Sequence, residues 1–134
     1  DGWIDGYPSE SLDLYNNYTD LIRKNIDYDL FEFRQSRVEK AFNNSSIDID
    51  EYENSLASCR TGTVDSVIGY MLDVLCSTNK DPIIINNNTI PREIVKSKLL
   101  KADHEAMKSV VRAINTNPGI KNKKSYSISM LYNA

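Results

Sequence analysis

The residue types best suited to metal binding or nucleophilic chemistry are few and far apart in this sequence. His104 is the only histidine, and Cys59 and Cys76 are the only cysteines. A zinc site usually draws its ligands from close pairs such as CxxC or HxxxH, and neither spacing occurs here. The sequence therefore predicts no metal site and no cofactor, and it favours a structural or surface role for His104.

Acidic residues supply the next candidates for chemistry. Asp48, Asp50 and Glu51 resemble the start of a calcium loop, but the required glycine is missing. The three-residue spacing of Asp48 and Glu51 fits a capping box at the start of a short helix. Paired carboxylates for acid–base catalysis remain open as an alternative, although nothing in the sequence marks out a pair. No dinucleotide, phosphate-loop or nucleophile-elbow motif is present, so we predict a binding domain with no catalytic residues.

The charges are distributed unevenly along the chain. Residues 1–90 hold 16 acidic and 7 basic side chains, whereas residues 91–134 hold 3 acidic and 9 basic ones. A basic segment beside an acidic one is typical of a surface for nucleic acid or an acidic partner, but a folded domain can also neutralise such charges internally. We slightly favour internal neutralisation.

The chain length of 134 residues fits one domain. Residues 1–14, with Gly2, Gly6 and Pro8, predict a linker or N-terminal arm, and residues 15–134 predict a single helical domain. The missing initiator methionine and the uncapped last residues indicate a piece of a larger protein. Apolar periodicity predicts helices at about 18–26, 30–42, 48–56, 64–75, 91–99, 103–116 and from 122 onward.

The helix over 64–75 has the broadest apolar face and should lie at the centre of the core. Pro82 ends this helical pattern, and two β-branched segments then flank Asn86-Asn87-Asn88. Asparagine tolerates the positive φ angles of tight turns, which predicts a hairpin. The predicted fold is therefore mainly α: a compact bundle of about five to seven helices with one short β-hairpin near residues 83–90.

Several side chains have predicted positions within these elements. Cys76 lies in an apolar helical pattern and should be buried. Pro91 suits the first turn of a helix, and Asp103 should cap the next one. The helix after Pro91 is predicted to have an inner face of Ile94, Val95 and Leu99, and the last helix to carry Tyr126, Met130 and Leu131 on one face.

The cellular compartment is predicted from sequence features that are missing. No stretch reaches about 18 apolar residues, the length that a membrane span needs, and the N-terminus does not resemble a signal peptide. Two cysteines are too few for a disulfide framework. A cytoplasmic location is the simplest prediction.

Three stretches stand out together: Tyr18 to Asp29, Val74 to Ser77 with Ile83 to Ser97, and Asn122 to Ala134. In order and spacing they resemble a known family, the C-terminal domain of RepA-type plasmid replication initiators from low-GC Gram-positive bacteria. The domain in that family is similar to the C-terminal domain of the primosomal protein DnaD. DnaD-like domains often end in Tyr-x3-Ile-x3-Trp, whereas this sequence has Tyr126, Met130 and Ala134 at those positions.

The resemblance implies a protein-docking domain that recruits a host replisome component, primase or the helicase machinery, to the plasmid origin. In that family another domain, a winged helix, binds origin DNA. The partner-binding residues that we predict are basic: Lys121, Lys123, Lys124, Arg92, Lys96 and Lys101. The alternative is an auxiliary DNA-binding domain in which these cations, with Lys98, contact phosphates. Self-association through a helical face is a third hypothesis.

Overall fold

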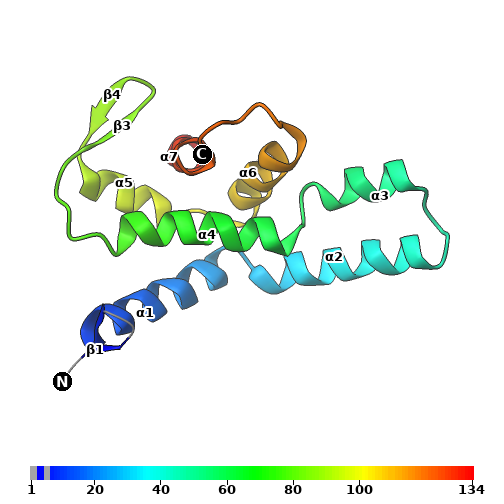
Figure 1. The fold of residues 1–134 in the computed structure, drawn as a ribbon, viewed down its shortest axis with the longest axis horizontal. Coiled ribbons are helices and arrows are strands. Elements are labelled where there is room, and N and C mark those ends of the chain that lie inside the picture. The colour runs from blue at the N-terminus through cyan, green and yellow to red at the C-terminus, as the bar shows by residue number, and fades with distance from the viewer. Residues whose placement is uncertain (1–2, 5–6) are drawn as a thin grey trace.

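The computed structural model describes residues 3–4 and 7–134, with side chains from Leu12 onward. The described residues form seven helices and two short antiparallel strand pairs (Figure 1). The helices are α1 (Ser9–Asn25), α2 (Tyr28–Asn43), α3 (Ile49–Leu56), α4 (Thr61–Leu75), α5 (Arg92–Leu99), α6 (His104–Thr116) and α7 (Lys123–Asn133). The strands are β1 (Trp3–Ile4), β2 (Tyr7–Pro8), β3 (Ile83–Ile85) and β4 (Asn88–Ile90). The mainly helical fold with a hairpin near residues 83–90 is confirmed, and the pair β1–β2 is an addition to it.

Helix α4 is the centre of the core, as its broad apolar face predicts. It crosses the middle of the molecule, with α1 and α2 on one side and α5, α6, α7 and the hairpin on the other (Figure 1). Its buried side chains are Val64, Val67, Ile68, Met71, Leu72, Val74 and Leu75. The flanking helices complete the core with Ile22, Phe31, Val95, Met107 and Leu131, among others.

Helix α1 is longer than its apolar stripe predicts. It begins at Ser9, although the periodic residues start only at Tyr18. The boundary placed after residue 14 therefore falls inside a helix. Asp27, with a left-handed φ of 55°, joins α1 to α2 and changes the direction of the chain.

Side-chain caps begin several helices at the predicted residues. The Asp48 carboxylate accepts a hydrogen bond from the backbone N–H of Glu51 at 2.8 Å, and that of Asp103 accepts from Ala106 at 2.9 Å. These bonds satisfy N–H groups that have no partner within the first helical turn. The acidic cluster at residues 48–51 thus caps a helix, as predicted.

The hairpin β3–β4 also has the predicted form. Ile83 pairs with Ile90, and Ile85 pairs with Asn88. Asn86 and Asn87 form the turn with φ angles of 52° and 65°, the two consecutive positive values that a type I′ turn requires. Asparagine adopts these angles at little cost, which explains the asparagine-rich turn.

Two predictions about buried side chains are wrong. Ile94 is 48% exposed, because the inner face of the short helix α5 consists of Val95 and Leu99, four residues apart. Cys76 is only partly buried, because it is the last-turn cap of α4, where the chain leaves the core. The buried thiol is instead that of Cys59, which is 2% exposed.

In the part of the chain that the structure describes, every helix falls short of the length and hydrophobicity that a membrane crossing needs.

Candidate protein-docking groove

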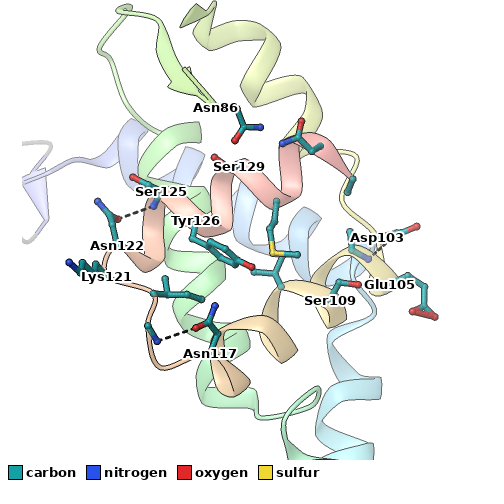
Figure 2. Close-up of a pocket in the computed structure, with 17 residues that line it drawn as sticks. Asn86, Asp103, Glu105, Ser109, Asn117, Lys121, Asn122, Ser125, Tyr126 and Ser129 are labelled. Carbon is teal, nitrogen blue, oxygen red and sulfur yellow. Dashed lines mark hydrogen bonds between the residues drawn. The ribbon is translucent and has the colours of Figure 1, made fainter. Parts of the chain in front are cut away.

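A groove with a volume of about 1060 Å³ lies between α6 and α7 (Figure 2). Helix α7 lines it with Ser125, Tyr126, Ser129, Met130 and Asn133, and α6 with Ala106, Ser109 and Val110. The loop between the two helices closes one end, and Asn86 from the hairpin turn reaches its edge. Three separate parts of the sequence therefore form one surface.

The rotation of α7 about its axis places Tyr126 and Met130 in this groove. The residues of α7 that face the core are Ser127, Ile128 and Leu131, and the Ser127 hydroxyl donates to the Lys123 carbonyl at 2.7 Å. The three residues predicted to lie on one face of this helix are therefore divided: Tyr126 and Met130 line the groove, whereas Leu131 is buried. Leu131 lies about 100° around the helix from Met130. Met130 packs only partly against the core and also lines the groove.

Helix α6 forms the opposite wall of the groove, and its main apolar stripe faces the core. Met107, Val110 and Val111 are buried against the core. Small side chains, Ala106 and Ser109, are left on the adjacent flank, where they leave room between the helices. The groove is a direct result of this difference in side-chain size.

Two acidic side chains at the groove are engaged within the domain. The carboxylate of Asp103 is used as a helix cap. Glu105 forms an ion pair with Lys108 at 2.8 Å, and the hydrogen bond from this lysine holds the pKa of Glu105 below its usual value. The hydroxyls of Ser109 and Ser129 complete a rim of hydrogen-bonding groups around the apolar side chains.

Charges mark the two ends of the groove. Lys121 lies at the end near the start of α7, and Asp103 and Glu105 lie at the opposite end (Figure 2). An occupant is therefore offered a cation at one end and carboxylates at the other. This order favours one direction of binding over its reverse.

The predicted cluster of lysines at the start of α7 is spread over different sides of the molecule. Only Lys121 lines the groove. Lys123 lines a second hollow beside Thr63 and Tyr70. Lys124 forms an ion pair with Asp73 at 3.3 Å. Neighbours in the sequence thus serve separate surfaces, because successive helical residues differ by about 100° in direction.

The other predicted cations lie mainly around the end of α4. Arg92 donates from Nε to the Asp81 carbonyl at 2.9 Å, and Lys96 Nζ lies 3.5 Å from the Ser77 carbonyl. Cations near the C-terminal end of a helix interact favourably with its dipole. Lys101 is exposed in the turn after α5. The structure therefore brings Arg92 and Lys124 to one hollow, but it does not bring Lys101 or Lys123 to the α6–α7 groove.

The sequence analysis did not predict three groove residues of α7 as partner-binding: Tyr126, Ser129 and Met130. The signal that could have found them is an excess of apolar residues on α7. Tyr126 and Met130 form one stripe at a four-residue spacing, and Ile128 and Leu131 form a second. One narrow helix cannot bury both stripes against the same core, so one of them remains available for a partner.

His104 has a structural role, which is one of the two roles that the sequence predicted for it. Its Nδ1 lies 2.8 Å from the Ile26 carbonyl, and its ring lies against Phe31 with centroids 4.3 Å apart. It thereby joins the start of α6 to the α1–α2 junction. Among the described residues, no three His, Cys, Asp or Glu side chains gather closely enough to hold a metal ion.

The chain is a small helical domain with a surface groove between two of its helices. The chain belongs to DUF6017, a family of unknown function whose model matches residues 38–134. This range contains α4 to α7 and therefore every residue that lines the groove. No curated protein and no solved structure matches the chain.

Proposed function

We propose that this chain is the protein-docking domain of a plasmid replication initiator, and that it binds a host replisome component in the α6–α7 groove. Primase and the helicase machinery are the proposed partners, and the proposed compartment is the cytoplasm. The groove is the observation that carries the proposal. The resemblance of residues 18–29, 74–77, 83–97 and 122–134 to RepA-type initiators supplies the biological setting, and these residues include the hairpin and α7.

The composition of the groove supports a protein partner. Tyr and Met are enriched in the centres of protein interfaces, where they offer large contact areas at modest entropic cost. Tyr126 and Met130 lie side by side on α7, four residues apart, beside the serine hydroxyls of the rim. An amphipathic helix in an apolar groove is a common way for such a surface to be recognised.

The test is direct binding of purified host primase and purified replicative helicase to the domain, measured by calorimetry. The variants Tyr126→Ala and Met130→Glu should each weaken binding by about tenfold or more, as expected for the loss of an anchor residue. Ile49→Glu is the matched control, because Ile49 is 53% exposed on α3, away from the groove. Equal binding by all three variants would remove the groove from the proposal, and no binding of either host protein would contradict the proposed partners.

Auxiliary DNA binding is the second candidate, and one observation favours it. Arg92 and Lys124 line a common hollow beside Ser77, the residue whose carbonyl contacts Lys96. Each of these cations already has a partner within the domain, which weakens the case for phosphate contacts. A steep decrease of DNA affinity with salt, reduced by Arg92→Gln with Lys124→Gln, would favour this candidate over protein docking.

A further inference from the structure

Helix α1 carries a row of large apolar side chains that stay partly exposed in the described chain. Leu14 is 43% exposed and Leu21 is 40% exposed, whereas Ile22 and Ile26 on the inner side are fully buried. Of the seven large hydrophobic residues exposed in the described part of the chain, three, Leu14, Tyr15 and Leu21, belong to this one helix. The packing of α1 on α4 uses only part of its apolar surface.

The two leucines face the same direction. They are seven residues apart, which is close to two full helical turns, and they lie about a quarter turn from Ile22. Figure 1 shows α1 at the edge of the molecule, with α4 along one side. Its neighbours are α2, α4 and the short strands β1 and β2. The leucine row is therefore accessible to another molecule.

Opposite charges flank this row at its two ends. Asp13 lies one residue before Leu14, and Lys24 lies three residues after Leu21, and both are exposed. They are eleven residues apart, or about three turns, so they lie on the same flank of the helix. Neither forms an ion pair with another described residue. The row thus has an acid at its N-terminal end and a base at its C-terminal end.

We propose that this face binds a second copy of the chain, with the two α1 helices antiparallel. In that arrangement Leu14 of each copy packs on Leu21 of the other. The same flank of both helices meets across the axis, so Asp13 of each copy faces Lys24 of the other. The surface is complementary to itself, as a two-fold symmetric interface requires, and such dimers are the commonest oligomers.

The contact is small, so the dimer is weak. A helix of 17 residues is about 25 Å long, and pairing it with a copy gives an interface at the low end of specific contacts, below about 1,200 Å². Dimerisation should therefore depend on protein concentration. Helices α6 and α7, which form the groove, lie across α4 from α1 (Figure 1), so the failure of one proposal leaves the other intact.

The first test is sedimentation equilibrium of the complete 134-residue chain at several concentrations. We expect a monomer–dimer equilibrium that Leu21→Glu weakens by about tenfold or more, since this change buries a carboxylate opposite Leu14. Ile94→Glu is the matched control, because Ile94 is 48% exposed on α5 and should not affect dimerisation. Circular dichroism checks that both variants fold. A monomer at every concentration up to about 1 mM, or an equal effect of the control, overturns the proposal.

The second test uses the charges and is specific for the antiparallel arrangement. Asp13→Lys places two cations together in each contact, and Lys24→Glu places two carboxylates together, so each variant alone should dimerise about three- to tenfold more weakly. In a heterodimer of the two variants, one contact joins the two introduced charges, which are opposite, and the other joins the native Asp13 to the native Lys24. The mixture should therefore recover wild-type association. If it associates no better than either variant alone, the antiparallel α1 pair is wrong.

Discussion

Lys124 Nζ lies 3.3 Å from a carboxylate oxygen of Asp73, and this ion pair joins the basic last third of the chain to the acidic remainder. It fixes the start of α7 to the last turns of α4. Part of the charge imbalance along the sequence is therefore neutralised within the fold. Lys121, three residues earlier, lines the groove instead and is available to a partner.

The two lysines should consequently respond differently to charge reversal. Lys121→Glu should slow association with the replisome partner at low salt, because it reverses the charge at one end of the groove. Lys124→Glu should instead cost about 0–1 kcal/mol of stability, the usual contribution of an exposed ion pair. Stopped-flow binding at two salt concentrations and urea denaturation measure the two effects. A triple change of Lys121, Lys123 and Lys124 that leaves partner affinity unaltered at both salt concentrations would exclude this cluster from docking.

The core position of α4 predicts a large effect of truncating Leu72. This side chain is 3% exposed, so Leu72→Ala removes buried apolar surface and leaves a cavity, at a cost of about 2–5 kcal/mol. Urea denaturation gives the change in the free energy of unfolding. Ile94→Ala is the control and should cost less than about 1 kcal/mol, because Ile94 is 48% exposed and such changes are usually small at an exposed position. Similar values for both variants would contradict the central role of α4.

Tyr28 should make the stability of the folded state depend on alkaline pH. Burial, followed by the hydrogen bond that its hydroxyl donates to Asp65 at 2.6 Å, raises its pKa from 10.0 to about 12. The folded state holds this proton more tightly than the unfolded chain does. The stabilisation is therefore complete below about pH 10 and is lost as the pH rises toward 12.

Absorbance titration at the tyrosinate band tests this property. One of the eight tyrosines should ionise later than the rest, and Tyr28→Phe should remove that late step. The variant should also lose less stability than the wild type between about pH 10 and 12, because the linked proton is absent. A late step that persists in Tyr28→Phe would assign the raised pKa to another tyrosine.

The two thiols should differ in their rate of modification. Burial raises the pKa of both Cys59 and Cys76, but Cys76 is only partly buried, whereas Cys59 is 2% exposed. Reaction with a disulfide reagent at about pH 8 should therefore show one faster and one very slow thiol, because attack requires an accessible thiolate. Cys76→Ser should abolish the faster phase. Loss of the slow phase in that variant would reverse the assignment.

Local features of the sequence determined most of the elements. The broad apolar face of residues 64–75 predicted a buried central helix, and Asn86 and Asn87 predicted the hairpin turn through their tolerance of positive φ angles. Asp48 and Asp103 marked two helix starts. Each of these signals depends on residues within a few positions of one another, so the sequence alone carries it.

Tertiary structure alone decided which of several apolar side chains became the core and which became surface. Leu131 is buried while Met130 lines the groove, and Val95 is buried while Ile94 is exposed. These pairs are adjacent in the sequence and similar in hydrophobicity. Whether each of these side chains is buried or exposed depends on how α5 and α7 are rotated against α4. This rotation is set by packing between residues far apart in the chain. The pairing of Lys124 with Asp73 arose in the same way, since these two residues lie on different helices, α7 and α4, far apart in the sequence.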